Sequence, residues 1–268
     1  MVEGCEIMVD IFELLDDELD LQMEYERMFY MLFHEDYYNQ TLAYYFNEKL
    51  YDWDYRGTCS SVEEIIKKLK LYNMTFGTKT INDILKLMQF ILNIKLFLDN
   101  KGLENDSFVL YKNIYYILNK MNYEYKIEND RVYLYPKDEE VFMAIDNVNK
   151  DMKSLLFEYI KFDIKNDVTS KSRLLSEIAK KMEPLRKEYS TTNKTLTEKI
   201  FQLFNKLDIR HNNKAGSKKN EIVANMTEEE LIGWYDKLYK LIIYLINQKE
   251  NNSLLRESEK FIRNLDES

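Results

Sequence analysis

Glycine and proline are scarce in this sequence, and their scarcity limits the folds that the chain can adopt. Only six glycines and two prolines occur in 268 residues. A β-sandwich or a barrel needs many tight turns, and turns draw heavily on these two residues. Apolar residues make up 45% of the chain, which is enough for a sizeable core at this length. We therefore expect a mostly α protein built as a helical bundle.

One stretch has the two-residue periodicity of β-strands. Residues 123–127 and 131–135 each alternate in polarity, and the Glu-Asn-Asp sequence at 128–130 is typical of a tight turn. We therefore predict one β-hairpin, inserted near the middle of the helical chain. It could decorate a helical domain. Alternatively, it could be the wing of a winged-helix DNA-binding domain, and this wing would carry Arg131 and Lys137.

Composition and charge divide the chain into three predicted regions. Residues 1–58 form an acidic, aromatic-rich helical segment with fifteen Asp and Glu and a net charge of −12. Residues 59–136 form a helical region that ends in the hairpin. Residues 137–268 have apolar stripes at helical spacing and short connections, as in a helical bundle. Within this region, residues 171–219 carry a net charge of +8, so an anionic partner would meet the chain there.

Periodicity and capping residues also predict where helices of the third region begin and end. The predicted features are one long helix along the stripe 141–160, a kink at Pro184 or a break at Glu183, helix starts at the capping-box pairs Thr195/Glu198 and Thr227/Glu230, a helix at 228–248 and a last polar helix at about 252–265.

Metal and membrane functions find no support in the sequence. Cys5 and Cys59 are too few for a disulfide framework, and no Cys/His spacing fits a zinc site. We therefore expect neither a metal nor another cofactor. No apolar run approaches eighteen residues, and the N-terminus lacks a basic segment followed by an apolar one. These features predict a cytoplasmic protein without membrane association.

The best candidate for chemistry lies where a helix of the third region should end. There Arg210 and His211 are adjacent, and the chain has only one other histidine, His34. Histidine gains and loses a proton near neutral pH. Arginine binds a phosphate through two hydrogen bonds and stabilises charge that develops on it. Together they could cleave RNA without a metal. The polar and basic residues that would hold the RNA are Asn212, Asn213, Lys214, Lys218 and Lys219.

A purely structural role explains the same residues. Positive side chains near the C-terminus of a helix interact favourably with its dipole. Asn212 or Asn213 can adopt the left-handed conformation that often ends a helix. Under this interpretation Arg210 and His211 complete a helix and take no part in catalysis.

Two stretches of the third region carry a resemblance to a known family. They are residues 207–213 (LDIRHNN), with the loop after them, and residues 234–239 (WYDKLY). With these stretches, residues 138–250 resemble the HEPN superfamily of helical bundles, found in prokaryotic toxins, abortive-infection proteins and CRISPR effectors. The resemblance implies a metal-independent ribonuclease, commonly a dimer whose two motifs face each other.

The match to the family motif is partial. Arg210 matches the family's arginine, and His211 matches the polar residue that follows it. Active members have a histidine separated from the arginine by four to six residues, where this chain has Ala215, Gly216 and Ser217. Either His211 serves as the acid–base group, or the domain binds RNA or a protein without cutting.

These observations lead to two functional hypotheses. The first is a prokaryotic antiviral-defence or toxin-type protein that acts by RNA binding or metal-independent RNA cleavage, as a homodimer or with a partner protein. The second is a non-enzymatic helical protein-interaction or sensor module of a defence system. Phosphate contacts weaken steeply as salt rises, whereas apolar contacts do not, so salt dependence separates the two.

Overall fold

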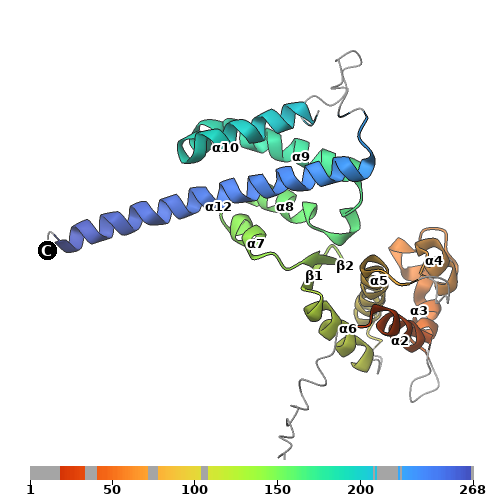
Figure 1. Cartoon of the computed structure of the whole chain (residues 1–268). Helices are drawn as coiled ribbons and strands as arrows, with labels where there is room; N and C mark the ends of the chain where they lie inside the picture. Colours follow the sequence, from red (N-terminus) through yellow and green to blue (C-terminus); the bar gives the residue numbers. More distant parts are fainter. Residues whose placement is uncertain are drawn as a thin grey trace, which may run out of the picture. The chain divides into compact units, whose positions relative to one another are not determined.

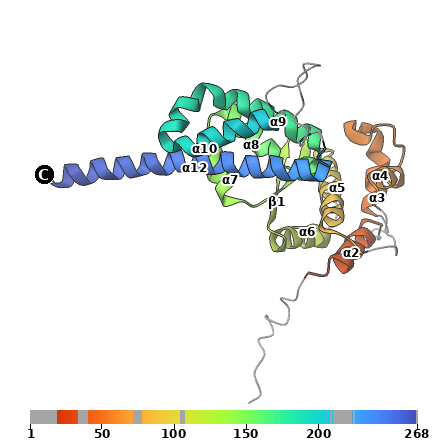
Figure 2. The ribbon, with the colours of Figure 1, turned by 45° about the horizontal axis from the view of Figure 1, so that its top comes forward.

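A computed structural model describes residues 19–33, 41–71, 78–103, 108–207, 209, 223 and 225–266 (Figures 1 and 2). Their regular structure consists of helices and one two-stranded hairpin. The prediction of a mostly α chain with a hairpin near the middle is therefore confirmed. The chain divides into two compact units, residues 1–134 and 135–268.

The first unit is organised around α5 (Ile81–Asn100), which is apolar on most of its surface and buries ten of its side chains. Thr80 caps this helix, and its hydroxyl and the Asp83 carboxylate satisfy each other's backbone N–H groups. Phe46 packs edge-on against Phe90 and Phe97 of α5. The other helices of the unit are α2 (Leu21–Phe33), α3 (Leu42–Lys49), the 3-10 turns Leu50–Asp52 and Asp54–Arg56, α4 (Val62–Leu69) and α6 (Phe108–Lys120).

The predicted hairpin is formed by β1 (Tyr123–Glu128) and β2 (Arg131–Pro136). Asn129 and Asp130 have φ angles of 50° and 58°, as required in a tight two-residue hairpin turn. The Asn93 side chain of α5 accepts a hydrogen bond from Val132 N (2.9 Å) and donates one to Val132 O (3.1 Å). The Arg131 guanidinium, expected in a DNA-binding wing, stacks 3.6 Å from the ring centroid of Tyr55.

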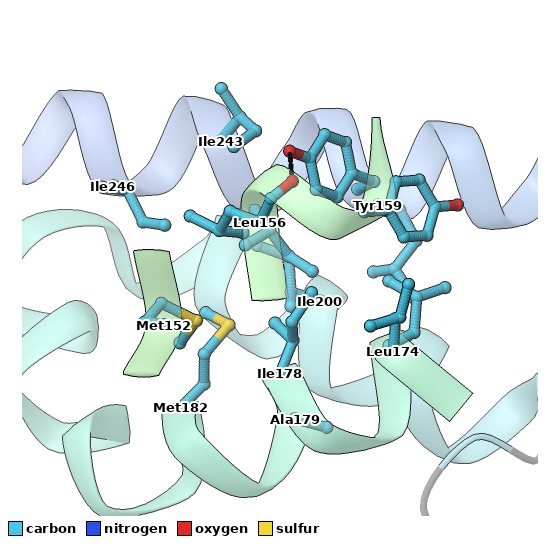
Figure 3. Close-up of a cluster of buried hydrophobic side chains, with 14 of the residues drawn as sticks. Met152, Leu156, Tyr159, Leu174, Ile178, Ala179, Met182, Ile200, Ile243 and Ile246 are labelled. Carbon is cyan, nitrogen blue, oxygen red and sulfur yellow. Dashed lines mark hydrogen bonds between the residues drawn. The ribbon is translucent and has the colours of Figure 1, made fainter. Parts of the chain in front are cut away.

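The second unit is a helical bundle in which α12 (Glu228–Asp266) runs along α7, α9 and α10 (Figures 1 and 2). Figure 3 shows its core, to which Met152 and Leu156 of α8, Ile178 of α9, Ile200 of α10 and Ile243 of α12 contribute. The remaining elements are α7 (Glu139–Asp146), α8 (Lys150–Tyr159), the 3-10 turn Phe162–Ile164, α9 (Val168–Met182), the 3-10 turn Glu183–Leu185 and α10 (Arg186–Lys206).

Proline and the capping box at Thr227 set helix boundaries as predicted. Helix α9 ends at Met182, directly before the 3-10 turn that contains Pro184. The Glu230 carboxylate accepts from Thr227 N (2.9 Å), and the Thr227 hydroxyl accepts from Glu230 N (3.2 Å).

Two predicted helix boundaries are wrong, and an asparagine sets the observed boundary in each case. The expected single helix at 141–160 is two helices, because Asn149 caps α8 by accepting from Met152 N (3.0 Å). The expected start at Thr195 and Glu198 is also wrong. Asn193 interrupts α10 with an extended backbone (φ −152°, ψ 95°), and its side chain accepts from Leu196 N (3.0 Å).

The prediction of two helices at 228–248 and 252–265 is wrong as well. Helix α12 is continuous over 39 residues, because residues 249–251 contain neither glycine nor proline. Its last part is not simply polar, since Leu254, Leu255, Phe261 and Ile262 are large exposed apolar side chains there. In the part of the chain that the structure describes, no helix has the length and apolarity needed to cross a membrane.

Candidate functional site

The predicted RNA site lies outside the described residues. This holds for all seven of its members: Arg210, His211, Asn212, Asn213, Lys214, Lys218 and Lys219. The structure does describe the protein on both sides of them. Helix α10 ends at Lys206 and helix α12 begins at Glu228, at the same end of the bundle (Figure 1).

Both sides of this segment are attached to the bundle. Leu207 and Ile209 are buried in the core, and Ile209 N donates a hydrogen bond to Phe204 O (3.0 Å). On the other side, Val223 packs against the same core, and the capping box at Thr227 fixes the start of α12. The residue directly before Arg210 is therefore held in place by apolar burial and a backbone hydrogen bond.

Tyr159, Lys171, Asp236 and Tyr239 form a partly buried ion-pair cluster in the same bundle. Lys171 is in the first turn of α9 and only 4% exposed, and its ammonium forms an ion pair with Asp236 of α12. Tyr159, the last residue of α8, donates a hydrogen bond to Asp236 Oδ1 (3.0 Å). The carboxylate therefore joins three helices.

Stacking completes the ion-pair cluster. The Lys171 ammonium lies 4.6 Å from the ring centroid of Tyr159, which is close enough for a cation–π interaction. The rings of Tyr159 and Tyr239 are 4.2 Å apart and nearly parallel, at 9°. The Tyr239 hydroxyl donates to the carbonyl of Leu156 (2.8 Å), drawn as a dashed line in Figure 3. The Lys171 charge therefore has both an anionic and an aromatic partner.

The chemistry of the cluster favours a structural role. Burial, followed by the charge of Asp236, raises the pKa of Tyr159 far above its usual value, so this phenol stays protonated and remains a donor. Only one member of the cluster could be found from the sequence. Lys171 lies on the apolar stripe of α9 that continues through Leu174, Leu175 and Ile178. Its partner Asp236, 65 residues away, carries no such signal.

We expect the free energy of unfolding of the second unit to fall above pH 10. Burial, with a smaller effect of Glu188, raises the pKa of Tyr189 to about 12, and burial raises the pKa of Tyr239 well above its usual value. A raised folded-state pKa gives stability that is complete below the unfolded pKa and lost as pH rises through the folded one. For Tyr189 this window is pH 10 to about 12, with a loss of about 1.4 kcal/mol per pH unit.

Urea unfolding at a series of alkaline pH values measures this loss. The free energy of unfolding of Tyr189→Phe should fall less steeply between pH 10 and 12, because the substitution removes one of the ionising groups. A free energy of unfolding that stays constant over this range would contradict the expectation.

Neither metal ligands nor known relatives identify the site. Among the described residues, no group of three His, Cys, Asp or Glu side chains is arranged to hold a metal ion. No protein-family model, curated protein or solved structure matches this chain.

Proposed function

We propose that the second unit binds RNA through residues 210–222 and cleaves it without a metal, in prokaryotic antiviral defence or as a toxin. The observation that supports this proposal is the attachment of the segment at both sides, with the buried Ile209 directly before Arg210. An arginine directly after a fixed residue stays close to that end of the bundle, where its guanidinium can bind a phosphate. The helical bundle and the position of Arg210 after α10 are also compatible with the resemblance to the HEPN superfamily.

The proposed reaction is attack of the ribose 2′-oxygen on the adjacent phosphorus. His211 takes the proton of the 2′-hydroxyl or gives one to the departing 5′-oxygen, and solvent water takes part in the other proton transfer. Arg210 binds the phosphate and stabilises its additional negative charge. The P–O5′ bond breaks, and the products are a 2′,3′-cyclic phosphate and a 5′-hydroxyl end. The basic side chains of Lys214, Lys218 and Lys219 contact neighbouring phosphates.

Cleavage of single-stranded RNA in EDTA tests the proposal. We expect Arg210→Ala to lower the rate by about 100-fold or more and His211→Ala by roughly 100- to 10,000-fold. Arg173→Ala is the matched control, because Arg173 is an exposed arginine of the same unit that pairs with Glu158. Equal cleavage by the wild type and all three variants would remove the catalytic proposal. Binding without cleavage that weakens steeply with salt would retain RNA binding alone.

The interaction-module hypothesis is favoured by a different observation. The last part of α12 exposes large apolar side chains that phosphate recognition does not use. Such side chains are typical of protein contacts. This hypothesis expects no ribonuclease activity and a partner whose binding changes little with salt.

A further inference from the structure

The last part of α12 has an apolar stripe that the described helices of its own bundle leave uncovered. The stripe consists of Leu254, Leu255, Ser258, Phe261 and Ile262, and we call it the C-terminal stripe. Its four apolar side chains are 52%, 62%, 64% and 56% exposed, in sequence order. In Figures 1 and 2 this part of α12 extends past the other helices of the second unit.

The C-terminal stripe faces away from the direction of the bundle. At about 100° per residue, its five positions fall within an arc of roughly 120°. The residues by which α12 contacts its own bundle, such as Leu238, Ile242 and Ile246, centre on a face turned by roughly 140° from the stripe, and buried Ile243 lies in line with the Phe261 edge. Most of the stripe is therefore not a continuation of the contact that α12 makes with the described helices of its own bundle.

The order of residues in the stripe is symmetric about Ser258. Leu254 and Leu255 lie four and three residues before it, and Phe261 and Ile262 lie three and four residues after it. The Ser258 hydroxyl donates to Leu254 O (2.9 Å), so the small central residue is hydrogen-bonded within its own helix. In an antiparallel pair with a two-fold axis at Ser258, Leu254 meets the partner's Ile262 and Leu255 meets the partner's Phe261.

We propose that the C-terminal stripe is a homodimer interface in which two copies of α12 pair antiparallel about Ser258. The proposal does not depend on the RNA site. The exposed apolar surface is on the order of 400 Å² per copy, about half of what a standard interface buries on each partner. The dimer is therefore weak, and it forms at micromolar concentration.

Charges beside the stripe define how the dimer responds to salt. Glu257 and Glu259 flank Ser258 on opposite sides and are exposed. In the antiparallel pair each faces the same residue of the other copy, which weakens the dimer until salt screens the repulsion. The same acidic flanks disfavour an anionic lipid surface, whose binding helices carry lysine and arginine there. Added salt therefore strengthens the homodimer, whereas it would weaken the docking of a basic helix.

Sedimentation equilibrium of the full chain, freed of nucleic acid, tests the proposal between 1 and 100 μM. The wild type shifts from monomer to dimer over this range, and more readily in 500 mM than in 50 mM NaCl. Leu255→Asp/Phe261→Asp stays monomeric at 100 μM, a loss of at least 100-fold in affinity. The control Met143→Asp changes a side chain of similar exposure on α7 and dimerises as the wild type does. Wild type that is monomeric at 100 μM, or a double variant that still dimerises, overturns the proposal.

Cysteine cross-linking tests the direction of pairing in a Cys5→Ser background. Leu254→Cys alone forms no disulfide dimer, because the two copies of this position are too far apart in an antiparallel pair. A mixture of Leu254→Cys and Ile262→Cys chains forms mixed disulfide dimers. Cross-linking of Leu254→Cys with itself overturns the antiparallel arrangement.

Discussion

Replacing Asp236 with alanine is expected to lower the free energy of unfolding of the second unit by about 3 kcal/mol. Lys171 is almost fully buried and would keep its ammonium in the bundle without the carboxylate. Tyr159 would lose the acceptor of its hydroxyl. The Asp236 side chain is 42% exposed, so solvent screens part of the interaction, and the loss should fall at the low end for a broken buried pair.

A double-mutant cycle isolates the ion pair. Lys171→Met should cost less, about 1 kcal/mol, because it removes the charge that needs a partner and keeps most of the side-chain volume. In the Lys171→Met background, Asp236→Ala should therefore cost clearly less than it does in the wild type, with a coupling energy of about 1–2 kcal/mol.

Trp234 can report on this unit alone. It is one of two tryptophans, so a Trp53→Phe background makes its fluorescence a single probe of urea unfolding. Glu158→Ala breaks the exposed pair with Arg173 and should cost no more than about 0.5 kcal/mol. Equal losses for Asp236→Ala and Glu158→Ala would contradict the importance of burial at Lys171.

Local signals in the sequence were sufficient for several features of the fold. Pro184 has no N–H and cannot continue the hydrogen bonding of α9, and the reciprocal bonds of Thr227 and Glu230 need residues only three apart. The turn at Asn129 and Asp130 likewise depends on the residues at the turn itself. Such features are predictable because both interaction partners lie within a few residues.

Other boundaries depend on distant partners. The Asn193 amide donates to Gln248 Oε1 (3.0 Å), 55 residues away. This contact favours Asn193 as the helix cap, although Thr195 and Glu198 match the capping-box pattern. The break expected near residue 250 coincides with a change in polarity along the helix. The polarity changes because α12 extends past its bundle there (Figure 1), whereas the helix itself continues.

The two candidate sites, Arg210–His211 and Lys171–Asp236, also differ in how far apart their members lie in the sequence. The Arg210–His211 pair is contiguous, so the sequence alone could single it out, and it remains a prediction outside the described residues. Lys171 and Asp236 belong to different helices, and only the packing of α9 against α12 brings them together. A lysine within an apolar stripe was a usable signal for one half of that pair.

Replacing Phe46 with alanine is expected to cost the first unit about 3–5 kcal/mol. Phe46 is fully buried and makes edge-to-face contacts with three rings, at centroid distances of 5.1 Å to Trp53, 6.3 Å to Phe90 and 5.7 Å to Phe97. Truncation forfeits these contacts as well as the apolar burial. Two of the rings belong to α5, a 20-residue helix with an intact N-cap, so the cavity should collapse only partly.

Trp53 fluorescence in a Trp234→Phe background measures this loss by urea unfolding, because Trp53 lies against the mutated side chain. Phe46→Leu keeps much of the volume and should cost roughly 1–2 kcal/mol. Tyr44→Ala is the matched control on the same helix: its side chain is exposed, and the expected change is within about 0.5 kcal/mol. Small domains are stable by only about 5–15 kcal/mol, so Phe46→Ala should remove a substantial fraction of the stability of the first unit. A loss no larger than that of Tyr44→Ala would show that the aromatic contacts around Phe46 do not hold α3 to α5.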